Sequence, residues 1–278
     1  MKRPSAQLSD RSAAHAQRIL DRLDRIGEVL RDRGDALALI GLGSVGRDLH
    51  RLDEHSDLDF LAIVEDEAKA HYLESLDWIQ AASAVAFSFP NTADGRKVLF
   101  RDGLYGEYAV FTLAELRRAE YPPGRVVWQR ADAPDGLDVP VRHPHLEEFD
   151  VPHQVGEAMT NLFVGLHRDA RGEGLSAVRL IQVHAVDRIL RILELTADDG
   201  ASRQDLFARE RGVERRYRER DLPLPAMVPG YGHNARAARA VLTWLQAHCA
   251  EHLDPALLGV VEDLLNDAER RGQSYRDR

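Results

Sequence analysis

Hydrophobic residues recur along the first half of this chain in two patterns. Four of them, spaced four, three and four residues apart, fall on one face of a helix expected over residues 10–33. These four are Ile19, Leu23, Ile26 and Leu30. Short apolar runs, which are typical of buried strands, alternate with helical stretches up to about residue 150. Strands are expected over 36–42, 58–64, 83–89, 97–101, 104–112 and 126–130, with a helix over 65–81 and turns at 91–95 and at Asp102-Gly103.

Beyond residue 150 the pattern is almost entirely helical. Helices are expected over residues 153–170, 175–196, 202–211, 233–250 and 255–272. The stretch 131–152 holds several prolines and acidic residues and is expected to be a linker. The pattern therefore predicts an α+β protein, with a small mixed-sheet domain over residues 1–140 followed by an all-helical domain over 141–278.

Composition narrows the class of protein. No apolar run approaches the roughly 20 residues of a membrane span, and the N-terminus has no apolar stretch typical of a secretory signal. Cys249 is the single cysteine, which excludes an internal disulfide and gives no support for a thiolate metal site. We therefore expect a cytoplasmic protein with no membrane partner. The net charge of −9 weighs against a nucleic-acid partner, because nucleic-acid affinity comes largely from neutralising phosphates.

A pair of aspartates stands at the start of the second expected strand. Asp57 and Asp59 follow Ser44 after twelve intervening residues. Side chains two positions apart on a strand point the same way, so the two carboxylates should project side by side. Adjacent carboxylates repel each other unless a cation lies between them, and Mg²⁺ prefers such oxygen ligands together with substrate phosphates. The pair therefore predicts a magnesium site.

The turn before this pair predicts a site for the phosphates of a nucleotide. Gly43 lets the backbone approach a phosphate closely, and Ser44 offers a hydroxyl and an N–H as donors. A helix beginning near Val45 would direct its N-terminus at the same anion, and Arg47 is placed to clamp a phosphate oxygen. A Gly-Ser turn and an Asp-x-Asp pair are each common alone, but together between apolar strands they favour a nucleotide–metal site.

A third acid is expected, because metal-assisted phosphoryl transfer needs the attacking hydroxyl deprotonated or metal-bound. Glu107 stands in the otherwise apolar run 106–111, where a buried carboxylate is costly without a partner. We expect it to be the general base or a further metal ligand. Glu157 and Glu173 in the helical half are alternative bases, although a solvated helix face or an ion pair is the stronger interpretation of each.

These residues resemble the signature of the polymerase-beta-like nucleotidyltransferase superfamily. That signature is a hydrophobic residue and Gly-Ser, a spacer of about this length, and then Asp-hydrophobic-Asp-hydrophobic, which corresponds here to residues 42–60. The resemblance assigns two residues to the triphosphate, two to Mg²⁺ and one to the later strand acid: Gly43 and Ser44, Asp57 and Asp59, and Glu107, respectively.

Within that superfamily the chain is most similar to bacterial enzymes that modify small molecules, namely the lincosamide and aminoglycoside nucleotidyltransferases. The similarity runs through 105–107, 110–112 and 123–128, and continues in the helical half through Leu166, Arg168, 171–173, 176–177 and 181–182. Enzymes of this type often work as dimers whose helical domain helps to form the acceptor pocket. The resemblance therefore implies a homodimer and a small-molecule acceptor, with antibiotic resistance as one outcome.

The expected reaction is transfer of a nucleoside monophosphate from a nucleoside triphosphate to a hydroxyl group, with release of pyrophosphate. Mg²⁺ is the expected cofactor and ATP the expected co-substrate. Two alternatives stay open on the sequence alone. One is a macromolecular acceptor, either a tRNA end or a protein side chain, and the other is a nucleotide-binding regulator without catalysis.

Overall fold

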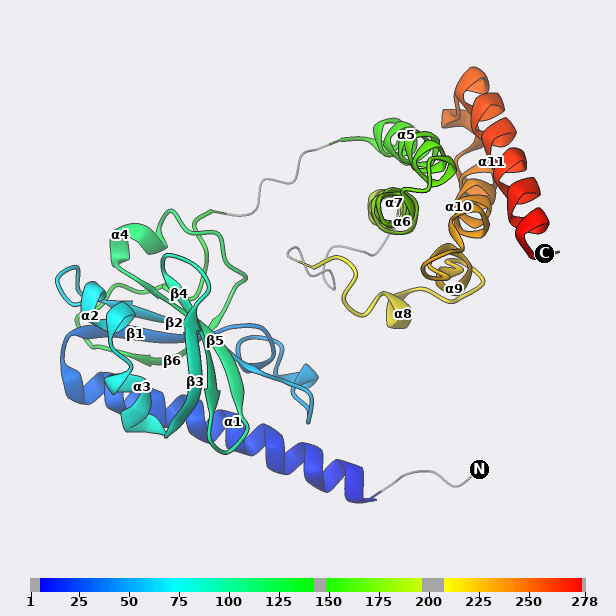
Figure 1. The fold of residues 1–278 in the computed structure, drawn as a ribbon. Coiled ribbons are helices and arrows are strands. Elements are labelled where there is room, and N and C mark those ends of the chain that lie inside the picture. The colour runs from blue at the N-terminus through cyan, green and yellow to red at the C-terminus, as the bar shows by residue number, and fades with distance from the viewer. Residues whose placement is uncertain (1–5, 143–148, 197–207, 277–278) are drawn as a thin grey trace. The chain divides into compact units, whose positions relative to one another are not determined.

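The computed structural model describes residues 6–142, 149–196 and 208–276. The chain forms two compact units, Met1–His145 and Leu146–Arg278 (Figure 1). In the described part of the chain, no helix is both long enough and apolar enough to cross a membrane. Each unit has its own hydrophobic core, so each is described separately.

The N-terminal unit is built on one mixed six-stranded sheet with the strand order β3-β4-β5-β2-β1-β6 (Figure 1). Strands β2 and β5 pair in parallel, and the other neighbours are antiparallel. Its strands are β1 (Ala36–Gly41), β2 (Leu58–Val64), β3 (Val85–Pro90), β4 (Gly95–Phe100), β5 (Tyr105–Phe111) and β6 (Arg125–Gln129). Its helices are α1 (Ala6–Arg33), α2 (Lys69–Glu74), α3 (Asp77–Ala82) and α4 (Leu113–Leu116), with 3-10 turns η1 (Gly43–Val45) and η2 (Leu49–Arg51). The predicted mixed-sheet architecture is thereby confirmed.

The two faces of this sheet pack against different partners. On β2, Phe60 and Ala62 join a core with α1, whose four predicted inward residues are all fully buried. Leu61 and Ile63 point the other way and pack with Leu116 of α4, because successive strand residues alternate between faces. We call these the α1 face and the α4 face of the sheet. Since β2 is covered on both faces, nearly all of its residues are apolar.

The helix predicted over residues 65–81 is wrong as a single element, because the chain forms α2 and α3 instead. The break falls at Ser75, whose backbone is extended. Tyr72 and Trp78 are both fully buried in one core, with ring centroids 5.1 Å apart. On a continuous helix, residues six positions apart would lie roughly 120° apart around the axis. Breaking the helix lets both rings enter the same core.

The segment predicted as a linker over residues 131–152 also differs in its first half. Residues 131–142 pack on the α4 face of the sheet, where Leu137 is buried. The hydroxyl of Tyr121 donates to the carbonyl oxygen of Leu137 at 3.0 Å. These residues are therefore part of the N-terminal unit, and residues 143–148 lie outside the described part of the chain.

In its described residues the C-terminal unit consists of helices joined by turns and contains no strand, as predicted. Its elements are α5 (Val151–Ala170), α6 (Gly174–Val178), the π-helical segment η3 (Arg179–His184), α7 (Ala185–Thr196), α8 (Val213–Arg216), α9 (Leu224–Met227), α10 (Asn234–His248), the 3-10 turn η5 (Ala250–His252) and α11 (Pro255–Arg276). The helix predicted over 175–196 is thus three successive segments with a π-helical centre. Of the helix predicted over 202–211, residues 202–207 lie outside the described residues, and the rest forms turns.

Candidate active site

Asp59 and Glu107 meet on one face of the sheet. They are register partners in the parallel pairing of β2 with β5, although they lie far apart in the sequence. Asp59 shares its face with Leu61, and Glu107 shares its face with Ala109. Leu61 and Ala109 both pack in the core on the α4 face. The two carboxylates therefore stand side by side on the α4 face, near the ends where β2 and β5 begin.

The Gly43-Ser44 turn lies directly beside Asp59, because β1 and β2 are antiparallel neighbours. The backbone N–H of Leu42 donates to the carbonyl oxygen of Asp59 at 2.8 Å. Gly43 has a φ of +52°, and a Cβ there would meet nothing within 4 Å, so backbone conformation rather than space requires glycine. The N–H of Gly46 closes the turn by donating to the carbonyl oxygen of Gly43 at 3.0 Å.

Among the residues that the structure describes, no protein group accepts from the first donors of this turn. Within the described residues, neither the N–H groups of Gly43 and Ser44 nor the Ser44 hydroxyl donates to a protein acceptor. The turn is a three-residue 3-10 helix, so the helix N-terminus anticipated near Val45 is not formed. Successive N–H groups in a turn of this kind make an anion-binding concavity without a helix. The local chemistry expected of a phosphate site is therefore present beside Asp59.

Two arginines tie this turn to the start of β6. Arg125 donates from Nε and Nη2 to the carbonyl oxygen of Val45, at 3.2 and 3.0 Å. Arg47 donates from Nε to the carbonyl oxygen of Gly124 at 2.8 Å and from Nη2 to Asp138 at 3.1 Å. The guanidinium of Arg47 thus braces the loop, while its side chain keeps 52% exposure. A triphosphate contact by Arg47 stays a prediction, and Arg125 stands closer to the turn itself.

Asp57 ends a tightly bonded loop that leads into β2. The Asp53 backbone N–H donates to the hydroxyl of Ser56 at 3.0 Å, and the Ser56 N–H donates back to the Asp53 carbonyl oxygen at 3.2 Å. Nε2 of His15, on α1, lies 3.2 Å from the carbonyl oxygen of Ser56. These contacts fix the backbone immediately before Asp57, whose side chain is exposed beside the half-buried Asp59.

The carboxylate of Glu107 is held by two neighbouring strands. Asn91, just after β3, donates its amide N–H to Oε1 at 2.6 Å. Lys97 on β4 places Nζ 3.4 Å from Oε2 and is the register partner of Glu107. The charge of Glu107, followed by that of nearby Tyr105, raises the pKa of Lys97. Glu107 is thereby oriented as a carboxylate while 44% of its side chain remains exposed.

The acids fit a hard divalent cation shared with a substrate. Within the described part of the chain, no three Asp, Glu, His or Cys side chains gather closely enough to hold a metal by themselves. Mg²⁺ does not need such a group, because one or two carboxylates with phosphate oxygens and water complete its shell. Asp57 and Asp59 offer oxygen ligands beside the free donors of the turn. Glu107 already contacts Lys97 and Asn91, and its role as a base or as a further ligand stays a prediction.

Sequence reasoning missed Asn91, Lys97 and Arg125 as members of this site. The sequence predicts Asn91 only as a residue of the turn over 91–95, and this turn is formed. Arg125 reaches the site through the long-range pairing of β6 with β1, which no local signal marks. Lys97 pairs with Glu107 across the successive strands β4 and β5, so the hairpin expected through Asp102-Gly103 was the signal that could have placed it there. Of the alternative bases, Glu157 is exposed, and Glu173 forms an ion pair with Arg168 at 2.6 Å.

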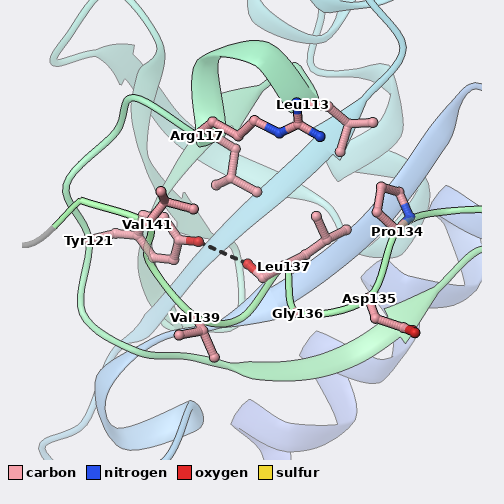
Figure 2. A pocket seen from close by; sticks show the side chains of 10 residues that line it. Leu113, Arg117, Tyr121, Pro134, Asp135, Gly136, Leu137, Val139 and Val141 are labelled. Carbon is pink, nitrogen blue, oxygen red and sulfur yellow. Dashed lines mark hydrogen bonds between the residues drawn. The ribbon is translucent and has the colours of Figure 1, made fainter.

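A small hollow on the α4 face lies between α4 and the loop that follows β6 (Figure 2). Tyr121, Leu137, Val139 and Val141 line it, and the Tyr121–Leu137 hydrogen bond spans it. Its volume is about 100 Å³. Ligand pockets are usually several times larger, on the order of 300–1,000 Å³. None of the predicted site residues lines this hollow.

Comparison with known proteins adds two loose structural neighbours. No family model and no curated protein matches this chain. An aminoglycoside 6-adenyltransferase from Bacillus subtilis aligns with a TM-score of 0.29 and 11% identity, covering 93% of this chain and 97% of the other. A nucleotidyltransferase-like protein from Exiguobacterium sibiricum 255-15 aligns with a TM-score of 0.29 and 11% identity, covering 90% and 74%. Likeness at this level decides neither fold nor activity, which rest on the residues described above.

Proposed function

We propose that this protein is a magnesium-dependent nucleotidyltransferase. It moves a nucleoside monophosphate, expected to be AMP from ATP, to a hydroxyl group of a small molecule and releases pyrophosphate. The observation that carries this proposal is the pairing of Asp59 with Glu107 on one sheet face, beside the Gly43-Ser44 turn. The proposed phosphate site, cation site and base are thus adjacent, as phosphoryl transfer requires.

The turn supports binding of the β and γ phosphates. The N–H groups of Gly43 and Ser44 are donors directed by the backbone rather than by flexible side chains, and the Ser44 hydroxyl is a side-chain donor beside them. Arg125 holds the carbonyl oxygen of Val45 and so fixes the shape of this turn. Such preorganised donors stabilise developing negative charge at little reorganisation cost during the reaction.

Asp57 and Asp59 are the residues that would hold Mg²⁺. When bound, this ion supplies positive charge against the phosphate oxygens and the leaving pyrophosphate. Glu107 accepts the proton of the acceptor hydroxyl, whose oxygen then bonds to the α-phosphorus. The bond from that phosphorus to the bridging oxygen of pyrophosphate breaks, and pyrophosphate carries away the electron pair. Lys97 and Asn91 keep the carboxylate of Glu107 aimed along the α4 face.

The test is pyrophosphate release by purified protein with Mg²⁺ and each of four nucleoside triphosphates. It is run with and without a panel of lincosamides, aminoglycosides and neutral polyhydroxyl compounds, and acceptors are weighed by mass spectrometry. The proposal expects acceptor-dependent release and a product heavier by one nucleoside monophosphate. An Asp57→Asn, Asp59→Asn double variant should be inactive, and full activity in it would overturn the proposal.

The same assay separates the two alternatives. Nucleotide binding without pyrophosphate release under any condition favours a regulator that does not catalyse. Release only with RNA or protein added favours a macromolecular acceptor, and for RNA the binding should weaken steeply with salt. Light scattering on the same sample measures the mass and tests the expected homodimer.

A further inference from the structure

A row of paired residues crosses four strands on the α4 face of the sheet. Asp59 on β2 pairs with Glu107 on β5, Glu107 pairs with Lys97 on β4, and Lys97 pairs with Phe89 on β3. Directly paired residues of neighbouring strands place their side chains on the same face. The row therefore runs without interruption from the cation site at Asp59 to an aromatic side chain at the sheet edge.

A second row beside this largely charged one is apolar. Tyr105 on β5 pairs with Leu99 on β4, which pairs with Phe87 on β3. Phe87, Phe89 and Tyr105 are 58%, 42% and 40% exposed. The rings of Phe87 and Phe89 have centroids 5.7 Å apart. We call Phe87, Phe89 and Tyr105 the aromatic platform. Large aromatic side chains that are exposed together and bordered by polar groups are typical of binding surfaces.

The strand order places this platform on the acceptor side of the reaction. Phosphoryl transfer needs the attacking and leaving oxygens roughly in line with the phosphorus between them. The turn that would hold the leaving pyrophosphate ends β1, the cation ligand Asp59 is on β2, and the base Glu107 is on β5. Continuing along the sheet past Glu107 leads to β4 and then β3. An acceptor whose hydroxyl meets Glu107 therefore lies over the aromatic platform.

The charges around the platform select against a polycation. Lys97 lies between Phe89 and Glu107 and is ion-paired with Glu107. The platform itself contains no carboxylate, and the negative charge of Glu107 is already balanced by Lys97. A polycationic acceptor would meet a fixed ammonium group here instead of an acidic lining. An uncharged ring compound loses nothing from that lysine and gains contact with the aromatic faces.

We propose that the aromatic platform beside Glu107 is the acceptor site and that it takes an uncharged hydroxyl compound with a sugar or aryl ring, rather than a polycation. This rests on the proposed nucleotidyltransferase function. A second copy of this chain pairing along β3 is the competing occupant. That edge is interrupted by a bulge between Val85 and Phe87 and ends at Pro90. Bulges and prolines are features that prevent strand pairing at sheet edges, so the small ligand is favoured.

The experiment measures binding without chemistry. Saturation-transfer NMR is recorded with 4-nitrophenyl β-D-glucopyranoside and, separately, with kanamycin, on the full chain in 150 mM salt. We expect saturable binding of the aryl glycoside, weaker by about tenfold in a Phe87→Ala, Phe89→Ala variant. A Tyr231→Ala variant, which removes an exposed aromatic residue of the C-terminal unit, should bind like the wild type. Both platform phenylalanines are exposed, so the double variant should keep the wild-type unfolding midpoint, measured in parallel.

Three results would overturn the proposal. They are kanamycin binding more tightly than the glycoside, glycoside binding unchanged in the double variant, and a wild-type dimer that becomes a monomer in the double variant. Binding of α,β-methylene-ATP with Mg²⁺ is measured on the same samples. If the wild type does not bind α,β-methylene-ATP, the nucleotidyltransferase function is refuted, whatever the result with the glycoside. If the double variant still binds α,β-methylene-ATP, the phosphate site is independent of the platform.

Discussion

Glu107 is the parallel-strand partner of Asp59, and Asn91 and Lys97 each contact one of its two carboxylate oxygens. Removing a base that is oriented in this way should slow the chemical step more than it weakens nucleotide binding. Glu107→Gln is expected to lower kcat by about 10²- to 10⁴-fold with little change in the KM for the triphosphate. Steady-state pyrophosphate release at several triphosphate concentrations measures both constants.

Glu173→Gln is the control for that prediction. Glu173 is similarly exposed and also ion-paired, with Arg168, but lies in the helical unit. Its variant should retain the wild-type kcat. An equal loss of activity in both variants, or full activity in Glu107→Gln, would contradict the assignment of the base.

Comparing Gly43→Ala with Gly34→Ala should separate the cost of backbone strain, which both variants have, from a loss of phosphate binding, which only Gly43→Ala should show. Both glycines have positive φ, +52° and +76°, and a Cβ at either would meet nothing within 4 Å. Each alanine is therefore expected to cost about 1–2 kcal/mol of unfolding free energy through strain alone. Only Gly43→Ala should also weaken binding of α,β-methylene-ATP. Urea unfolding and calorimetry measure the two effects, and equal binding by both variants would speak against the turn as the phosphate site.

Arg125→Lys should raise the KM for the triphosphate by roughly tenfold, the equivalent of about one charge-assisted hydrogen bond. Lysine cannot reproduce the two hydrogen bonds that Nε and Nη2 make to the carbonyl oxygen of Val45. Arg130→Lys is the matched control, because Arg130 also bonds a carbonyl oxygen, that of Gly34 at 3.0 Å. The control should lose stability without a change in KM, and the same KM shift in both variants would argue against a specific role of Arg125.

Lys69 forms an ion-pair cluster whose contribution to stability depends on pH. Its Nζ lies 2.5 Å from Asp94 and 2.7 Å from Glu115, and its side chain is 13% exposed. Burial alone lowers the pKa of Lys69, but the two carboxylates outweigh this and raise it above its ordinary 10.5. Burial raises the pKa of Glu115, but Lys69 and the Thr112 N–H lower it by more, so that the pKa falls below its ordinary 4.5.

These shifts set the pH window of the effect. The stabilisation from Glu115 is complete above its ordinary pKa of 4.5 and is lost as pH falls through the lower folded value. The stabilisation from Lys69 is complete below 10.5 and is lost as pH rises through its higher folded value. Lys69→Met should therefore destabilise the protein by roughly 1 kcal/mol between these limits and by less in acid. Urea unfolding at pH 7 and pH 3 tests this. Arg25→Met, which breaks an exposed pair with Glu28, should have less effect at pH 7.

The sequence by itself determined the elements that carry the predicted motif. The apolar run 58–64 matches β2 at both ends, and the four spaced residues of the first helix are fully buried as predicted. The common side of Asp57 and Asp59 stays a prediction from strand periodicity, because Asp57 lies just before the first residue of β2. These features depend on neighbouring residues, so local patterns are sufficient to predict them.

Only the tertiary structure decided which distant residues join that motif. Glu107 was a candidate from its position in an apolar strand, but its pairing with Asp59 depends on strand order and register. Lys97 reaches Glu107 across the β4–β5 hairpin that the sequence predicted, whereas Asn91 reaches it only because the β3–β4 hairpin folds beside β5. The division of the helix predicted over 65–81 has the same origin, since two rings must enter one core. Long-range pairing and shared burial are properties of the packed chain, which no local window of sequence contains.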